Sequence, residues 1–294
     1  MRRHNANFCS EHFLKLCLDQ TAKTIKEFDM LAPGDRALVA VSGGKDSLAV
    51  WDILLDLGYE ADGLYVGLGI GDYSDTSGQF ARDYAAKRGV KLIEVSLRAD
   101  YGFDVPTAAA ATKRVPCSAC GMSKRHIFDK AALDGGYDAI VTGHNLDDEA
   151  AVLYGNTLTW QVDYLARQRP VLPASDGFPR KVKPLIRLGE REMAAYCVLK
   201  GIDYIVDECP MAIGNKHIRY KEALNELESA SPGTKRDFYL GFLRNAVDAF
   251  AASDATAKAS LGSCERCGGP ANSDVCAFCG SPRRPQPMNP SPSP

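Results

Sequence analysis

The sequence of 294 residues lacks any run of about 18 apolar residues, the length that a membrane-spanning helix requires. Its first residues also lack the apolar core of a secretory signal peptide. Lys and Arg (35) nearly balance Asp and Glu (37), so the net charge of −2 gives no global attraction to nucleic acid. We therefore expect a soluble, cytoplasmic protein without a membrane partner, in which any nucleic-acid binding depends on a local basic patch.

Two common nucleotide-binding signatures are also absent. No Gly stands five residues ahead of a Gly-Lys-Ser/Thr, and no Gly-x-Gly-x-x-Gly occurs. Instead, residues 42–47 read Ser-Gly-Gly-Lys-Asp-Ser, between an apolar stretch that predicts a buried strand (36–41) and one that predicts a helix (48–55). The glycines permit a tight turn, and the N–H groups of the helix start attract an anion. The pattern predicts a phosphate-binding loop; an accidental Gly-Gly turn is the alternative.

Apolar stretches alternate with amphipathic ones along most of the chain. Besides 36–41 we expect strands at 61–68, 90–95, 138–142 and 203–206, and helices that start at Ser10 as N-cap, at 75–88, after Cys117, and at 190–200, 220–227 and 238–251. The Ala-rich stretch before Cys117 and residues 157–184 have little regular pattern. The alternation predicts an α/β fold with a doubly wound, parallel, five-stranded sheet of the Rossmann-like type.

A second turn follows the strand expected at 138–142. It reads Gly143-His144-Asn145-Leu146-Asp147-Asp148-Glu149 and lies at the carboxyl edge of the sheet, where ligands bind in such folds. The adjacent carboxylates of Asp147 and Asp148 suit Mg²⁺ bound together with phosphates. Helix N-capping is the alternative, and it explains only one of the two carboxylates.

Basic residues are interleaved with aromatic ones in the irregular stretch and just beyond it. Trp160 and Tyr164 stand close to this set in the sequence. Such a combination could hold a nucleic-acid backbone, whereas a solvated surface loop is the alternative. The candidate nucleic-acid-binding residues are Arg167, Arg169, Arg180, Lys181, Lys183 and Arg187.

Cysteines are numerous, ten in all, and disulfides rarely persist in a cytoplasmic chain, so metal ligation is the better interpretation. Cys9 and His12 have the Cys-x-x-His spacing of zinc ligands, but two residues do not complete a tetrahedral site, and an ordinary helix start explains them equally well. Near the end of the chain, two Cys-x-x-Cys-Gly turns predict a zinc ribbon, with one Zn²⁺ bound by Cys264, Cys267, Cys276 and Cys279.

These motifs together resemble one family. Residues 42–47 resemble the pyrophosphate-binding loop of the N-type ATP pyrophosphatases (PP-loop enzymes). Together with Cys117-x-x-Cys120, the Gly143 turn, residues 180–188, Cys209-Pro210 and the ribbon, the loop resembles the tRNA 2-thiolation enzymes of the TtuA, TtcA and Ncs types. The resemblance covers nearly the whole chain. Cys9-x-x-His12 and the ribbon make the TtuA and Ncs types more similar than TtcA.

The resemblance implies that ATP adenylates the C2 oxygen of a tRNA uridine, releasing pyrophosphate, and that sulfur then replaces this oxygen and AMP leaves. It also implies a 4Fe-4S cluster on Cys117, Cys120 and Cys209, with one iron open for sulfur, and Lys124 and Asp148 as the catalytic pair. Three thiolates without a fourth ligand agree with such a cluster. A redox disulfide between Cys117 and Cys120 is the alternative.

The expected cofactors are therefore ATP, Mg²⁺, the cluster and Zn²⁺. The expected partners are tRNA, a sulfur donor such as a ubiquitin-like sulfur-carrier protein, and a second copy of the chain in a homodimer. Phosphates should lie on the 42–47 loop and adenine near the end of the second strand. The residues predicted to contact ATP are Val41, Ser42, Gly43, Gly44, Lys45, Asp46, Ser47, Gly67, Leu68, Gly143, Asn145 and Asp147.

In one respect the sequence departs from the family, whose members carry a further Cys-x-x-Cys ahead of the Cys-x-x-His. This sequence starts after that point, so we expect only an incomplete remnant of the N-terminal zinc finger. Other PP-loop activities, namely tRNA-cytidine 2-thiolation or lysidine synthesis, are the closest alternatives. A zinc-ribbon RNA-binding scaffold with a decayed nucleotide fold is a third, against which the intact residues 43–46 and Asp148 argue.

The expected organisation has five parts. They are the Cys-x-x-His segment with its helix (1–30), the catalytic domain (31–250), a small-residue linker (251–261), the zinc ribbon (262–280) and a disordered, Pro-rich tail (281–294). Because the linker offers little to anchor it, we expect the ribbon to move relative to the catalytic domain.

Overall fold

The computed structural model describes residues 4, 6–112, 115–175, 177–212, 216–254 and 261–281. Parts of the expected linker (255–260) and tail (282–294) therefore lie outside the described residues. No described helix combines the length and the apolar character needed to cross a membrane. The described elements are α1 (Ser10–Glu27), β1 (Arg36–Val41), α2 (Lys45–Asp56), β2 (Glu60–Gly67), α3 (Gly71–Arg88), β3 (Leu92–Ser96), α4 (Leu97–Tyr101), α5 (Val105–Thr112), α6 (Pro116–Asp134), β4 (Ala139–Thr142), α7 (Leu146–Leu158), α8 (Val162–Ala166), β5 (Val171–Leu172), β6 (Lys181–Val182), α9 (Glu190–Lys200), the 3₁₀ turn η2 (Pro210–Ala212), α10 (Lys216–Ala230), α11 (Thr234–Asn245), α12 (Val247–Asp254), β7 (Gly262–Ser263) and β8 (Pro270–Ala271).

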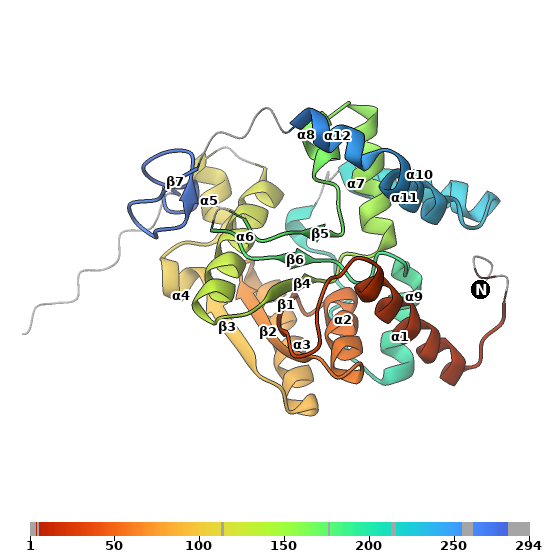
Figure 1. Ribbon diagram of the computed structural model, residues 1–294. Coiled ribbons are helices and arrows are strands. Elements are labelled where there is room, and N and C mark those ends of the chain that lie inside the picture. The colour runs from red at the N-terminus through yellow and green to blue at the C-terminus, as the bar shows by residue number, and fades with distance from the viewer. Residues whose placement is uncertain are drawn as a thin grey trace, which may run out of the picture.

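The central sheet has six strands in the order β3-β2-β1-β4-β6-β5 (Figure 1). The pairs β3/β2, β2/β1, β1/β4 and β4/β6 are parallel, which confirms the predicted α/β architecture. From β1 the chain proceeds outward through β2 and β3, and then returns to β4 on the other side of β1. In such sheets ligands bind at the carboxyl ends of the two strands where this order reverses, here β1 and β4.

The fifth and sixth strands differ from the prediction. The structure assigns no strand to residues 203–206, and the fifth parallel strand is β6, from the stretch expected to be irregular. Strand β5 pairs antiparallel with β6 and adds a sixth. Both strands have only two residues, too few to give a periodic pattern, although Val182 is fully buried beside Val141. In the segment expected as a strand, the Ile205 N–H donates to the Gly43 carbonyl and so supports the phosphate loop.

Several helices also differ from their predicted bounds. The Ala-rich stretch contains α4 and α5, and the helix expected at 220–227 extends over the fifteen residues of α10. The last helix is divided into α11 and α12 at Ala246. The residue at the N-cap of α1 is Cys9, with Ser10 as the first helical residue. Helix α9 has the predicted bounds.

Helices cover both faces of the sheet. On one face α1, α2, α3 and α9 pack around fully buried Trp51 and Tyr196 in a first core cluster. On the other face α4, α5 and α6 pack against Leu38 and Leu64 in a second cluster, to which the ribbon contributes buried residues such as Phe278 (Figure 1). A third cluster joins α7 to α11 through Leu153 and Tyr239. The strands are thus buried on both faces, as expected for a parallel sheet.

The phosphate loop fits tightly against α3, and this fit generates a prediction. Gly43 has φ +74°, and a Cβ atom there would lie 2.1 Å from the Ser77 carbonyl oxygen. Gly43→Ala should therefore lower the free energy of unfolding in urea by about 3 kcal/mol, from strain plus overpacking. The control is Gly89→Ala, which has φ +64° but no neighbour within 4 Å of the new Cβ, and should lose only about 1 kcal/mol. Equal losses at the two positions would contradict the close fit.

Candidate active site

The predicted phosphate loop connects β1 to α2. Gly44 is the N-cap of α2 and no side chain caps the helix, so its first N–H groups remain available to an anion. The loop is closed by Ser47, whose Oγ accepts from the Ser42 N–H at 3.0 Å and donates to the Gly44 carbonyl at 2.9 Å. Ser42 to Ser47 are thus arranged as a helix-start loop. Val41, at the end of β1, is buried beneath it.

The turn after β4 lies against this loop. A Cβ atom at Gly143 would lie 2.7 Å from the backbone of Asp46, so only glycine fits there. Asn145 caps α7 by accepting from the N–H groups of Asp147 and Asp148, while its Nδ2 donates to Asp46 Oδ1 at 2.9 Å. One oxygen of Asp148 accepts from the Asn145 N–H at 3.1 Å. The capping explanation therefore holds for one oxygen of Asp148, whereas the other, Oδ1, takes no part in the cap and pairs with Lys221.

Three charged residues that the sequence did not single out complete this region. Glu190, the first residue of α9, accepts from Lys45 Nζ at 2.8 Å. Lys221 of α10 contacts Asp148 Oδ1 at 2.6 Å and Glu190 Oε2 at 3.3 Å. Lys235 of α11 is buried and donates to Asp147. Helices far along the chain supply all three, so no local motif could have indicated them.

The ion pairs determine the charge states of the site. Burial, together with the negative charge of Asp148, raises the pKa of Asp46 to about 6, against the opposing effect of Lys45. Burial by itself would raise the pKa of Glu190, but hydrogen bonds and charge from Lys45 and Lys221 hold that pKa below its ordinary value. Burial disfavours the ammonium of Lys45, yet Asp46 and Glu190 raise its pKa. Lys45 and Glu190 are therefore both charged at neutral pH.

The predicted cluster cysteines converge around the start of α6. Cys117 is exposed and donates to the Met211 carbonyl at 3.7 Å, so η2, which follows Cys209, lies against α6. Burial raises the pKa of the half-buried Cys120, and the nearby thiols of Cys209 and Cys117 raise it further, while Lys124 opposes them. All three cysteines are free thiols, with no disulfide between Cys117 and Cys120. Cys17 and Cys197 are fully buried in the first core cluster, as predicted.

The thiols of Cys117, Cys120 and Cys209 are not spaced like the ligands of a single metal ion. In the part of the chain that the structure describes, the ribbon cysteines form the one group of three or more Cys, His, Asp or Glu residues whose ligand atoms all lie within 4.8 Å of one another. The thiols of Cys117, Cys120 and Cys209 are therefore spread more widely. A cluster of several irons is larger than one ion and requires such a spread.

Two other predicted sets are only partly brought together. Among the described residues no ion pair joins Lys124 to Asp148: Lys124 lies one turn after Cys120, and Asp148 pairs with Lys221. For the expected adenine contacts, Gly67 lines a cavity of about 470 Å³ at the carboxyl ends of β2 and β3, whereas Leu68 is buried in the second core cluster. The catalytic and adenine roles stay predictions.

Most candidate tRNA-binding residues form ion pairs within the chain. Lys181 pairs with Asp129 at 2.7 Å, Lys183 with Glu149 at 2.8 Å, Arg187 with Glu27 at 2.5 Å and Arg169 with Asp248 at 2.6 Å. Arg180 is half-buried. The guanidinium of exposed Arg167 lies 5.7 Å from the centre of the Tyr164 ring, and Tyr164 and Trp160 are among the most exposed large side chains. Arg167 is thus the candidate whose charge lies at an exposed aromatic surface.

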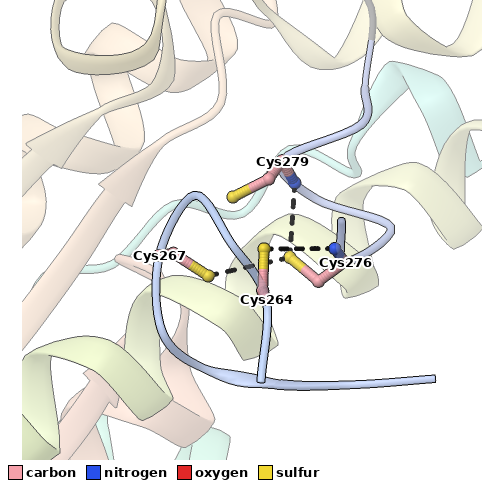
Figure 2. A group of neighbouring side chains, drawn as sticks. All are labelled: Cys264, Cys267, Cys276 and Cys279. Carbon is pink, nitrogen blue, oxygen red and sulfur yellow. Dashed lines mark hydrogen bonds between the residues drawn. The ribbon is translucent and has the colours of Figure 1, made fainter. Parts of the chain in front are cut away.

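The four ribbon cysteines point toward a common centre (Figure 2). Cys267 Sγ and Cys276 Sγ are 3.9 Å apart, close to the separation of about 3.8 Å that tetrahedral Zn–S bonds of about 2.3 Å impose. A hydrogen bond from the Cys276 N–H is the main cause that lowers the pKa of Cys264 to about 6, which favours the thiolate. The residues fit a zinc ion.

The ribbon is anchored on α6, contrary to the expectation of a loosely attached module. Phe278, between Cys276 and Cys279, is only 2% exposed and stacks on His126 of α6 with ring centres 4.0 Å apart. Tyr101 and Phe103 contact its edges. The composition of the linker predicts a mobile ribbon, but the burial of Phe278 against α6 holds the ribbon in place. One helix therefore carries two of the candidate cluster cysteines and the docking face of the ribbon.

At the other end of the chain, Cys9 Sγ and His12 Nδ1 are 2.9 Å apart on the surface. A hydrogen bond from the His12 N–H, together with this side-chain bond, lowers the pKa of Cys9, and the side-chain bond raises the pKa of His12. His4 Nε2 contacts Glu192 Oε1 at 2.6 Å. The side chains of Cys9 and His12 therefore point the same way, as predicted. In the described ranges no third ligand atom lies within 4.8 Å of both.

Comparison with known proteins gives a consistent result. No protein-family model matches the chain. The chain is 48% identical to the tRNA-5-methyluridine(54) 2-sulfurtransferase of Thermus thermophilus, covering 95% of this chain and 86% of that protein. It is 41% identical to the Pyrococcus horikoshii protein of the same name, covering 92% and 86%. The solved structure of the U34-tRNA thiolase NcsA from Methanococcus maripaludis with its 4Fe-4S cluster has a TM-score of 0.74 at 24% identity, covering 83% of this chain and 82% of that one, which shows a common fold.

The ribbon gives the second prediction. Phe278→Ala should leave zinc bound but release the ribbon, because the side chain contributes about 3 kcal/mol of packing. Hydrogen exchange should then rise in residues 261–281 and in α6 around His126. Cys267→Ser should instead lose zinc and unfold the ribbon, while Asn272→Ala, at an exposed ribbon position, should change neither. Full zinc content and unchanged exchange in Cys267→Ser would refute the assignment.

Proposed function

The chain belongs to the family of tRNA 2-thiolation sulfurtransferases, and on this basis we propose that it replaces the C2 oxygen of 5-methyluridine at position 54 of tRNA by sulfur, using ATP. The observation that carries the proposal is the arrangement of the phosphate loop and the thiols. Ile205 is hydrogen-bonded to Gly43 of the loop, and Cys209 follows four residues later, within about 14 Å of Ile205 along the chain. Oxygen activation and sulfur delivery thus have neighbouring sites.

The loop side would activate the oxygen. A carbonyl oxygen is a poor leaving group, so its attack on the α-phosphate of ATP, with loss of pyrophosphate, makes it part of AMP. The start of α2 and Lys45 would hold the phosphates. Asp46, Asp148 and Glu190 offer the oxygen ligands that Mg²⁺ prefers. The predicted ATP-binding residues of the two turns, namely 41–47 with Gly143, Asn145 and Asp147, come from segments that meet where Gly143 contacts Asp46.

The α6 side would deliver the sulfur. Cys117, Cys120 and Cys209 fit a 4Fe-4S cluster because they converge around the start of α6 and are spread more widely than the ligands of one ion. When bound, such a cluster supplies one iron without a protein ligand, to which sulfur can attach. Lys124, one turn after Cys120, would stabilise negative charge as sulfur attacks C2.

Further partners follow from this activity. The ribbon cysteines would bind Zn²⁺, and the sulfur would come from a donor such as a ubiquitin-like sulfur-carrier protein. A homodimer and a cytoplasmic location complete the proposal; tRNA and thiolate-held metals fit a reducing compartment. The similarity to sulfurtransferases across almost the whole chain favours this activity over lysidine synthesis, cytidine thiolation or a scaffold role.

Product analysis tests the proposed reaction. Protein reconstituted anaerobically with iron and sulfide, and given ATP, sulfide and tRNA, should form AMP and pyrophosphate in step with 2-thiolated 5-methyluridine in the digested tRNA. Asp148→Asn should reduce both products by at least about 100-fold, the loss typical of a catalytic group. Formation of ADP and phosphate would contradict the proposal.

A third prediction separates sulfur chemistry from ATP binding. Cys209→Ala should lose the iron of the reconstituted protein and its thiolation activity, but should bind ATP with unchanged affinity because the phosphate loop is intact. Cys9→Ala, which removes an exposed cysteine far from α6 in sequence, is the control and should retain iron. A Cys209→Ala protein with full iron content and a normal rate would refute the three-ligand assignment.

A fourth prediction concerns the exposed aromatic residues as part of the tRNA surface. Trp160 is 69% exposed and Trp51 is fully buried, so tRNA should quench fluorescence that arises from Trp160. Trp160→Ala should weaken tRNA binding by about 10-fold, the loss in affinity expected when one base no longer stacks on an aromatic ring. Arg167→Ala should reduce the salt dependence of tRNA binding. Val206→Ala removes another exposed apolar side chain and serves as control. Unchanged affinity in the Trp160 and Arg167 variants would exclude this surface.

A further inference from the structure

Lys221 forms ion pairs with two carboxylates, Asp148 and Glu190, that we propose as Mg²⁺ ligands at the nucleotide site. It reaches from α10 to Asp148 at 2.6 Å and to Glu190 at 3.3 Å, while Lys45 binds the other oxygen of Glu190 at 2.8 Å. A chain of alternating charges therefore runs from Asp148 through Lys221 and Glu190 to Lys45. Burial disfavours the Lys221 ammonium, but the two carboxylates outweigh it and raise its pKa, so this side chain is charged at neutral pH.

The helix that carries Lys221 is firmly placed. The neighbouring residue, Tyr220, packs on α7 at Gly155, where a Cβ atom would lie 2.6 Å from its ring, and meets the Tyr154 ring at 5.7 Å. The side chain of Lys221 is 26% exposed, so the ammonium can move on its four-carbon stem while the backbone stays fixed. Lys235 differs, because it is buried between Asp147 and Asn225 and serves to join α11 to α7.

We propose that Lys221 is a phosphate-responsive positioning residue. Without nucleotide it neutralises Asp148, and when ATP fills the loop its ammonium transfers to the phosphate oxygens and exposes the Asp148 carboxylate. The inference rests on the proposed function, since it takes residues 42–47 as the phosphate site. One observation supports it: the ammonium contacts the Glu190 carboxylate that also holds Lys45 of the loop. The chemistry agrees, because triphosphate oxygens attract an ammonium as carboxylates do.

A purely structural ion pair is the alternative, and it makes different predictions. Such a pair would anchor α10 to α7, so its loss would lower stability without altering the recognition of phosphate. The two cases are separated by comparing ATP with adenosine, which shares the base and ribose but has no phosphates. Binding is measured by calorimetry with EDTA present, so that the ammonium alone is tested and no activity is required.

Lys221→Met should weaken ATP binding by about 10- to 100-fold, the value of a hydrogen bond to a charged group, and leave adenosine binding unchanged. Lys221→Arg should keep ATP affinity close to that of the wild type, and Lys221→Gln replaces the Met variant if the latter does not fold. Lys216→Met, an exposed lysine of the same helix, is the matched control and should change neither affinity.

A double-variant cycle tests the transfer itself. Asp148→Asn removes the nearer of the two carboxylates that hold Lys221 and should tighten ATP binding, and this gain should vanish when Lys221→Met is added. Equal effects on ATP and adenosine, or a gain in Asp148→Asn that persists without Lys221, would overturn the proposal. If the wild type still forms AMP and pyrophosphate on tRNA in that case, the proposed function stands and only the role of Lys221 fails.

Discussion

A Cβ atom on Gly143 would collide with the backbone of Asp46, and the candidate site depends on this close contact between the turns after β1 and β4. The contact places the first turn of α7 against the first turn of α2, so that the Asn145 side chain reaches Asp46 and the negative charge of Asp148 acts on Asp46. The start of α2 has no side-chain cap and keeps N–H groups that favour negative charge, whereas Asn145 caps the start of α7. An anionic ligand on the loop would therefore meet the uncapped start of α2, beside the strands where the sheet order reverses.

Charge balance is the second constraint. Three carboxylates and two ammonium groups alternate beside the phosphate loop, and each group is half-buried, so loss of any one would leave a neighbour without its partner. These residues come from the phosphate loop, α7, α9 and α10. Because α7 and α10 also contribute to the third core cluster, the charges connect the candidate site to that cluster. Helix α6 likewise connects two parts of the molecule. It carries Cys117 and Cys120 near its start, and its His126 stacks on Phe278 of the ribbon.

The parts of the molecule that the sequence predicts well are encoded locally. Residues 42–47 and the ribbon knuckles are each contiguous, and their chemistry depends on backbone conformations that the glycines permit. The two-residue strands β5 and β6 are too short to create periodicity, and their place is decided by burial of Val182 against β4. Residues 203–206 have the composition of a strand, but the Ile205 N–H is used by Gly43 instead of a sheet partner. Glu190, Lys221 and Lys235 reach the site only through tertiary packing, which single-sequence reasoning does not provide. Phe278 was the one available signal for the docking of the ribbon.

The central claim is that the C2 oxygen of the base becomes part of AMP before sulfur takes its place. Oxygen-18 at C2 of the target uridine tests this most directly, with tRNA labelled at that atom and mass spectrometry of the nucleotide released in a single turnover. The account predicts one oxygen-18 atom in AMP for each 2-thiouridine formed, and none in pyrophosphate. Label found in water or in inorganic phosphate, with unlabelled AMP, would contradict it.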